Sequence, residues 1–301
     1  MPYHYYAFGL NIESEIECPL LIAGDGSAPD LVVRLGSVPH ELEQARERGA
    51  FYQISTGRLL LKIDHVACYL VSDGCEIIVE PHPTASEKDV RLFLLGSAMG
   101  ALLHQRGVWP LHGSAVASRS GAAAALFVGA RGIGKSTLAG VFHKRGFQVL
   151  SDDVCAITAG NDGTLKVWPA IPRIRLWTDS VVKLGGEPKQ LTRTRDALEK
   201  YEFPLRRFGH DPMAIKAIYA LYMSDDQEAV HLMPLKGYDK IQELTLNTYR
   251  LHFLTGMRLA PQHFQQAQAL ARQARVVRIT RPPQPFLLDE LADIIERDLA
   301  L

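Results

Sequence analysis

The sequence predicts an α/β protein with a small, mainly β domain at its N-terminus. Two patterns predict this class. Residues 1–85 contain short runs of β-branched and aromatic residues separated by turn residues, which is typical of strands. Between residues 122 and 142, an apolar run, a glycine-rich loop and a helix-compatible segment follow one another. That order is the strand, loop and helix of an α/β unit.

The N-terminal strands are expected at residues 5–12, 31–35, 51–55, 59–63, 67–71 and 76–80. Glycine, aspartate and proline between these runs favour turns. We therefore expect an antiparallel domain over residues 1–85, and none of its residues forms a recognisable catalytic set. Residues 86–105 are apolar almost all round, as in a buried helix, and Ser86 with Asp89 resembles a capping box. Residues 86–108 are predicted to be a helix that connects this domain to a second one, residues 109–301.

The glycine-rich loop is the strongest motif in the chain. Gly129, Gly134, Lys135 and Ser136 match the pattern G-x-x-x-x-G-K-[ST] of a phosphate-binding loop. Its glycines let backbone N–H groups point at an anion, and the helix that follows adds its positive N-terminal end. Lys135, expected to face solvent, can reach the β- and γ-phosphates, and the Ser136 hydroxyl can bind Mg²⁺. The predicted nucleotide-binding residues are Gly129, Ala130, Arg131, Gly132, Ile133, Gly134, Lys135, Ser136 and Thr137.

Two further strands are expected to flank this loop. Residues 111–118 form one and place His112 near the phosphates, and residues 147–157 form the other and carry Asp152 and Asp153. We expect the second strand to lie beside the strand that leads into the loop, because an α/β crossover returns the chain there. Two adjacent carboxylates could divide the work, one binding metal and one acting as base.

Three segments in this order, residues 111–113, 129–136 and 144–153, resemble the kinase domain of HPr kinase/phosphorylase. The resemblance implies a compact phosphate-loop fold related to phosphoenolpyruvate carboxykinase, which transfers the γ-phosphate of ATP to a serine hydroxyl. Looser matches at residues 8–10, 89–107, 172–177, 200–205 and 217–221 are similar to a divergent branch. Some members of that branch are encoded beside lasso-peptide genes and phosphorylate the C-terminal serine of a precursor peptide.

The resemblance also implies roles for individual residues. Lys135 would hold phosphates, Ser136 and Asp153 would bind Mg²⁺, Asp152 would accept the proton of the attacking serine, and His112 would lie near the γ-phosphate or orient Asp152. Three basic residues, Arg173, Arg175 and Lys200, are candidates for contacts with the transferring phosphoryl group. Residues 172–177 depart from the Glu-Arg-Gly-type signature of the family, so the sequence does not predict HPr as the acceptor or the reverse reaction.

The remaining chain is predicted to complete the α/β sheet. A strand is expected at residues 215–223, helical stretches at 240–255 and 261–274, a strand at 276–279 and a final helix from Asp289.

Composition limits the partners of the protein. The 301 residues include 33 Lys and Arg and 33 Asp and Glu, so no overall positive field attracts nucleic acid or an anionic membrane. The four cysteines have no metal-ligand spacing, and no apolar run is long enough to span a membrane. We expect a cytoplasmic protein with reduced cysteines, and a homo-oligomer is compatible with the sequence.

The leading hypothesis is an ATP- and Mg²⁺-dependent kinase that acts on a serine of a peptide or protein. One alternative is a small-molecule kinase, for example of free serine. Another is a regulator that binds nucleotide without transferring phosphate. The adjacent carboxylates favour a kinase over the regulator, because binding alone needs no second carboxylate.

Overall fold

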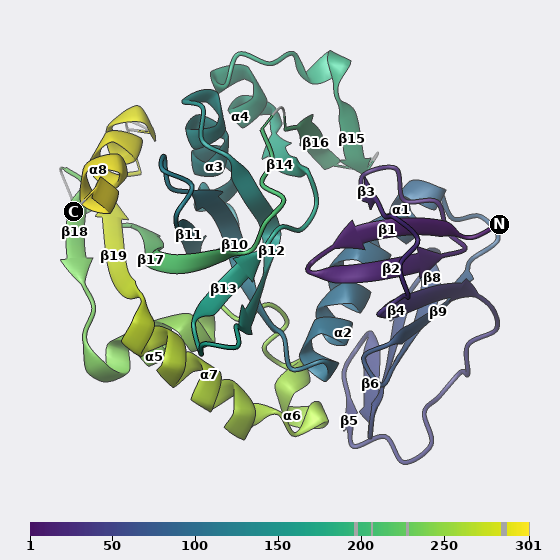
Figure 1. Cartoon of the computed structure of the whole chain (residues 1–301). Helices are drawn as coiled ribbons and strands as arrows, with labels where there is room; N and C mark the ends of the chain where they lie inside the picture. Colours follow the sequence, from purple (N-terminus) through teal and green to yellow (C-terminus); the bar gives the residue numbers. More distant parts are fainter. Residues whose placement is uncertain (196–197, 206, 227–228, 284–287, 301) are drawn as a thin grey trace. The chain divides into compact units, whose positions relative to one another are not determined.

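A computed structural model describes residues 1–195, 198–205, 207–226, 229–283 and 288–300 (Figure 1). The fold is mixed α/β and contains several sheets. The chain forms two compact units: residues 1–110 with 249–263, and residues 111–248 with 264–301. The division therefore differs from the predicted boundaries in two respects, because the helix at 86–108 and the segment 249–263 both belong to the first unit.

The first unit is built on a nine-stranded sheet with the order β3-β1-β2-β4-β9-β8-β7-β6-β5. Its strands are β1 (Tyr3–Ala7), β2 (Leu10–Ser14), β3 (Ile22–Ala23), β4 (Leu31–Leu35), β5 (Glu47–Arg48), β6 (Tyr52–Ser55), β7 (Arg58–Ile63), β8 (Ala67–Ser72) and β9 (Glu76–Pro81). Five of the six predicted strands are confirmed. The sheet is mixed rather than antiparallel, because β4 pairs in parallel with both β2 and β9.

The prediction of one strand over residues 5–12 was wrong. The chain reverses at Phe8 and Gly9, whose φ values are 58° and 78°, and β1 and β2 form a hairpin. Two consecutive positive φ angles are the geometry of a tight hairpin turn. The alternation of buried and partly exposed residues continues on both sides of that turn, which explains why the segment resembled a single strand.

The predicted helix is confirmed and runs as α1 (Glu87–Phe93), a π-helical segment η1 (Leu94–Ala98) and α2 (Met99–Gln105). Ser86 caps it, since its hydroxyl oxygen accepts a hydrogen bond from the Asp89 N–H. The predicted helical stretch at 240–255 is two helices instead. These are α5 (Gly237–Leu246), in the second unit, and α6 (Phe253–Met257), in the first.

The second unit contains a seven-stranded sheet with the order β11-β10-β12-β13-β17-β19-β18, and β11 also pairs with β17. The strands are β10 (Trp109–Ala117), β11 (Ala124–Gly129), β12 (Val149–Ala159), β13 (Leu165–Trp168), β17 (Met213–Met223), β18 (His231–Pro234) and β19 (Arg275–Arg281). The pairings close a ring of five strands. The strand that carries Asp152 and Asp153, β12, pairs with β10 and not with β11 as predicted, because β10 lies between them.

Helices cover both faces of this sheet. Tyr219 and Tyr222 lie three apart on β17 and so point to opposite faces. The Tyr219 hydroxyl donates to Asp298 of α8 (Leu288–Ala300), and the Tyr222 hydroxyl donates to Glu243 of α5. Arg145, after α3 (Lys135–Lys144), binds Asp293 of α8. Lys240 of α5 donates to the carbonyl oxygen of Ala271 in α7 (Ala260–Gln273), so these two helices are in contact. Within the described residues, no helix is both long and apolar enough to cross a membrane.

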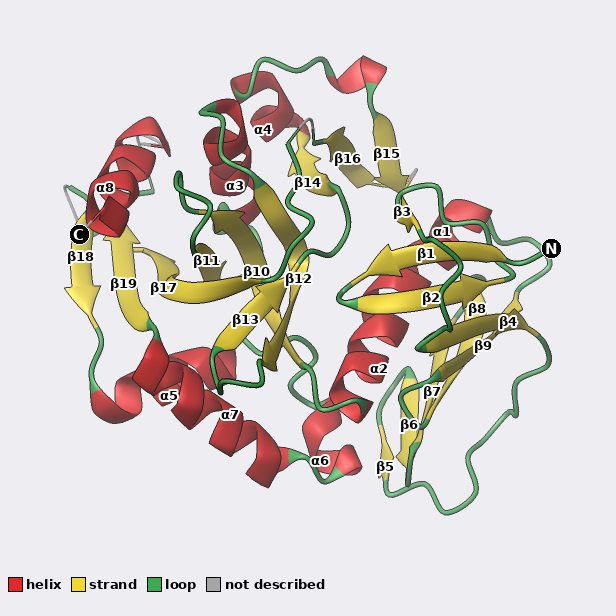
Figure 2. Cartoon of the chain, in the orientation of Figure 1, coloured by secondary structure: helices red, strands yellow, loops and turns green. Residues whose placement is uncertain are grey.

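A small sheet that the sequence analysis did not predict lies beside α3 and α4 (Thr178–Lys183) (Figure 2). Its order is β14 (Arg173–Trp177), β16 (Leu198–Pro204) and β15 (Thr192–Arg195), with the short helix η2 (Pro188–Gln190) before β15. Ile174 and Leu176 of β14 join the hydrophobic core with residues of α3. Arg173 and Arg175 alternate with them and therefore occupy the opposite face.

A substitution at Gly113 of β10 would show how tightly β10 packs on β11. A Cβ atom at this position would lie 2.5 Å from the Phe127 carbonyl oxygen, and a backbone atom cannot rotate away. We expect Gly113→Ala to lower the free energy of unfolding by about 1–3 kcal/mol, as overpacking does. Urea denaturation measures the change.

Gly96, in the π-helical segment, provides the matched control. Its nearest neighbour to a new Cβ would be the Tyr249 hydroxyl at 3.5 Å, an ordinary contact. Gly96→Ala should leave stability unchanged or raise it by up to about 1 kcal/mol, since alanine favours helix. Equal effects of the two substitutions would contradict the close packing of β10 on β11.

Candidate functional site

The glycine-rich loop joins the end of β11 to the start of α3. Gly129, Gly132 and Gly134 have φ values of 134°, 84° and 110°, which side chains rarely adopt. At Gly129 a Cβ atom would also lie 2.6 Å from the Leu221 carbonyl oxygen of β17. The loop therefore depends on glycine, and it leads directly into a ten-residue helix whose N-terminus favours an anion.

Lys135, the first residue of α3, folds back over this loop. Its ammonium group donates to the carbonyl oxygens of Gly129 at 2.8 Å and Ala130 at 3.0 Å. The side chain is buried, with the residue 7% exposed, so the expectation that it faces solvent was wrong. Burial lowers the pKa of Lys135, and the charges of Asp152 and Asp153 oppose that shift. The lysine and the two carboxylates therefore belong to one electrostatic site.

The other predicted loop residues have different environments. Ala130, Arg131 and Gly132 are exposed, and Ser136 is half-buried. Ile133 packs into the hydrophobic core. The Thr137 hydroxyl bonds with that of Ser180 on α4 at 2.9 Å, so this side chain is directed to α4.

Asp152 and Asp153 are adjacent on β12, yet both carboxylates reach the same neighbouring strands. In a regular strand, consecutive side chains point to opposite faces. Asp153 breaks this alternation, because its φ is 80°, a left-handed conformation that is uncommon for residues other than glycine. The sequence alone gives no sign of this geometry. Backbone conformations of this kind occur at functional sites more often than elsewhere.

Asp152 is almost completely buried and accepts two hydrogen bonds. Its Oδ1 accepts from the Ser114 hydroxyl at 2.7 Å, and its Oδ2 accepts from the Arg175 backbone N–H at 2.9 Å. The donors come from β10 and β14, so this carboxylate links three strands.

Asp153 lies between His112 and Arg175. Its Oδ2 is 3.4 Å from the Arg175 guanidinium, and its backbone oxygen accepts from His112 Nδ1 at 3.0 Å. Burial raises the pKa of Asp153, but the charges of Arg175, Arg173 and Lys200 together hold it below the usual value. Burial lowers the pKa of His112 despite the nearby carboxylate, so this imidazole is neutral at pH 7. Asp153 therefore remains ionised beside a neutral histidine.

The three basic residues predicted to contact the phosphoryl group differ in their burial and in their neighbours. Arg173 is buried, and its Nε lies 2.8 Å from Glu202 Oε2. Burial, reinforced by the charge of Arg175, lowers the pKa of Arg173 to about 10. Its Nη1 has no solvent-exposed surface and no hydrogen-bond partner among the described residues, so it is out of reach of a ligand. Lys200 lies opposite Trp177, with its ammonium 5.8 Å from the ring centre, and burial lowers its pKa. Arg175 and Lys200 therefore remain the candidates for the predicted contacts with a phosphoryl group.

Sequence reasoning missed two residues of the site, Ser114 and Arg281. Ser114 lies two positions after His112, so the period of a strand could have placed it on the same face. Arg281, at the end of β19, donates to the carbonyl oxygen of Ile133 in the loop at 3.2 Å. Nothing in the sequence links these residues, which are 148 positions apart. In the described part of the chain, no group of three or more His, Cys, Asp or Glu side chains is arranged to hold a metal.

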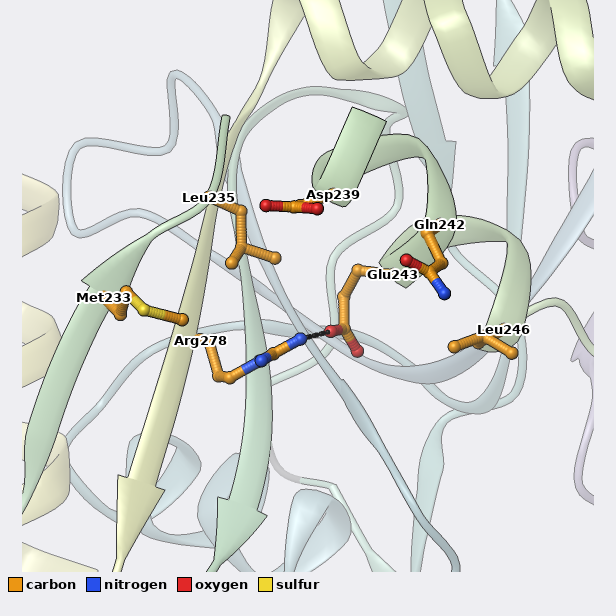
Figure 3. Close-up of a pocket in the computed structure, with 7 residues that line it drawn as sticks. All are labelled: Met233, Leu235, Asp239, Gln242, Glu243, Leu246 and Arg278. Atoms are coloured by element: carbon orange, nitrogen blue, oxygen red, sulfur yellow. Dashed lines mark hydrogen bonds and ion pairs between the residues drawn. The ribbon is translucent and has the colours of Figure 1, made fainter. Parts of the chain in front are cut away.

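A pocket elsewhere in the second unit contains none of the predicted residues. It lies among α5, β18 and β19 and is lined by Met233, Leu235, Asp239, Gln242, Glu243, Leu246 and Arg278 (Figure 3). Glu243 accepts hydrogen bonds from Tyr222, Asn247 and Arg278, the last at 3.0 Å. The donors come from β17, from β19 and from the residue that follows α5. This buried carboxylate therefore links the helix to the sheet and has a structural role.

Comparisons with known proteins give a distant similarity. No protein-family model matches the chain, and neither does any curated protein. Among solved structures, the HPr(Ser) kinase/phosphatase from Coxiella burnetii is similar to this chain at 14% sequence identity and a TM-score of 0.34. The similarity covers 64% of this chain and 93% of that one. A similarity at this level does not identify an activity, so the function must be argued from the site.

The left-handed conformation of Asp153 predicts an unusual order of stabilities. A side chain other than glycine costs about 1 kcal/mol in this conformation, so Asp153→Gly should be more stable than Asp153→Ala by about that amount. Both variants lose the contact with Arg175, and the difference between them reports the backbone alone. Urea denaturation measures it.

Asp152 is the matched control, since it lies in β12 and is not among the residues with positive φ. In an ordinary strand glycine is less stable than alanine, so Asp152→Gly should be the weaker variant by about 0.5–1 kcal/mol. The same order at both positions would show that the Asp153 backbone is not strained.

Proposed function

We propose that the protein is an ATP- and Mg²⁺-dependent kinase that transfers the γ-phosphate to a serine hydroxyl of a peptide or protein. One observation carries this proposal. The glycine loop after β11, Lys135 at the start of α3, and the carboxylates of Asp152 and Asp153 on β12 belong to one charged site. Binding of phosphate needs only the loop, whereas transfer also needs a base and a metal ligand.

The loop residues fit the phosphates of a nucleotide. Three glycines with positive φ leave room for a close approach to the backbone, and the N-terminus of α3 adds partial positive charge. Lys135 would exchange its two carbonyl acceptors for the β- and γ-phosphates. Ser136 and the ionised Asp153 would hold Mg²⁺, which neutralises phosphate charge when bound.

Asp152 would act as the base. As the serine oxygen bonds to the γ-phosphorus, the bond between that phosphorus and the β–γ bridging oxygen breaks, and ADP leaves. The proton of the serine hydroxyl passes to Asp152. Arg175 and Lys200 would stabilise the charge that develops on the phosphoryl oxygens. Arg173 would act through its charge and its packing on Glu202, because its guanidinium is not accessible. The neutral His112 would hold Asp153 in place.

The acceptor is proposed to be peptidic, including a C-terminal serine, and free serine is the competing acceptor. The proposed setting is the cytoplasm. Neither nucleic acid nor a membrane enters the proposal, since the protein has no net charge to attract them.

Lys135 provides the test of function. Lys135→Met keeps an apolar stem in the buried position and removes the charge, so we expect the protein to stay folded and to lose about 100-fold or more of its transfer rate. Transfer of labelled γ-phosphate from ATP would be measured with serine peptides, peptides ending in serine, and free serine.

Lys144→Met, which removes a lysine at the opposite end of α3, is the control and should keep full activity. Circular dichroism verifies the fold of both variants. Absence of transfer to every acceptor by the folded wild-type protein, or full activity of Lys135→Met, would refute the kinase. Transfer to free serine but to no peptide would establish the small-molecule kinase instead.

A further inference from the structure

Ser114 is a fully buried polar residue in β10, with an exposed fraction of 0%. Its hydroxyl oxygen is 2.7 Å from Asp152 Oδ1. The serine is the donor in this hydrogen bond, so its proton is directed at Asp152. This hydrogen bond therefore fixes the orientation of the buried serine hydroxyl.

The second oxygen of Asp152 is held as well. The Arg175 N–H of β14 donates to Oδ2 at 2.9 Å. One hydrogen bond would leave the carboxylate free to rotate about the Cβ–Cγ bond, whereas two donors on different strands fix its plane. Each oxygen keeps a further lone pair, because a carboxylate offers about four acceptor sites in all.

Ser114 also connects this carboxylate to the loop. His112 and Ser114 lie on the same face of β10 and contact Asp153 and Asp152 respectively. Between them, Gly113 packs directly against the backbone of β11, the strand that ends at Gly129. The position of the two carboxylates relative to the loop is therefore set through three consecutive residues of β10.

We infer that Ser114 is a positioning residue, which holds the Asp152 carboxylate so that its remaining lone pairs face the acceptor hydroxyl. The inference rests on the proposed kinase function and adds a residue that acts through Asp152 rather than on a substrate. Misplacement of a reacting group by a fraction of an ångström to an ångström lowers rates strongly, so the effect is expected in turnover.

The experiment compares Ser114→Ala, Asp152→Asn and the double variant in the full-length protein, with ATP and the acceptor that the wild type phosphorylates. Ser114→Ala should lower kcat about 10–100-fold and change the KM for ATP by less than about twofold. In the Asp152→Asn background, Ser114→Ala should cause no further loss, because the group that it positions is already gone. Ser114→Thr restores a hydroxyl and should recover most of the rate.

Ser14→Ala is the control for loss of a buried hydroxyl. Ser14 is 1% exposed and lies in β2 of the first unit, where its hydroxyl donates to the Ile16 carbonyl at 2.7 Å. This variant should keep the wild-type kcat. All variants are compared at a temperature where circular dichroism shows them folded.

The outcomes separate the two hypotheses. Full kcat in Ser114→Ala, or equal losses in the wild-type and Asp152→Asn backgrounds, overturns the positioning role while Lys135-dependent transfer leaves the kinase standing. If Ser114→Thr fails to fold, the double-variant comparison alone decides. Absence of transfer by the wild type overturns both.

Discussion

The left-handed backbone at Asp153 is the constraint on which the site depends. A strand with regular alternation would present one carboxylate to the site and turn its neighbour to the other face. The φ of 80° places both carboxylates where β10 and β14 can reach them. The cost is of the order of 1–3 kcal/mol, and the contacts of His112, Ser114 and Arg175 offset it. The strained backbone of Asp153 brings the carboxylates to these contacts, and the contacts in turn stabilise that backbone.

Charge balance explains why this buried cluster is stable. Asp152 and Asp153 lie in a region from which water is largely excluded, where unpaired carboxylates would be costly. The charges of Arg175, Arg173 and Lys200 lower the pKa of Asp153 and hold it ionised, while burial keeps His112 neutral. The neutral histidine can donate a hydrogen bond without adding a charge. Neighbouring cations thus compensate the negative charge of the carboxylates.

Lys135 helps to hold the glycine-rich loop in its conformation. Its ammonium group is held by two carbonyl oxygens of the loop itself, which are weaker partners than a phosphate because they carry only partial charge. The Ile133 carbonyl is held in turn by Arg281 from the far end of the chain. The loop is therefore supported from β11, α3 and β19.

The sequence by itself determined the local elements and the chemical groups. Periodicity and turn residues predicted five of the six N-terminal strands, the helix capped by Ser86 and the strand, loop and helix around Gly129 and Lys135, because these signals lie within a few consecutive residues. Only the tertiary structure decided which elements meet. Contacts between distant residues place β10 between β11 and β12, and they assign residues 249–263 to the first unit. They also form the small sheet of β14, β15 and β16 and bring Arg281 to the loop. Such contacts leave no local pattern, and neither does a single positive φ at an aspartate. For that reason the sequence named Asp152 and Asp153, whereas the fold alone revealed how Ser114 and Arg175 hold them.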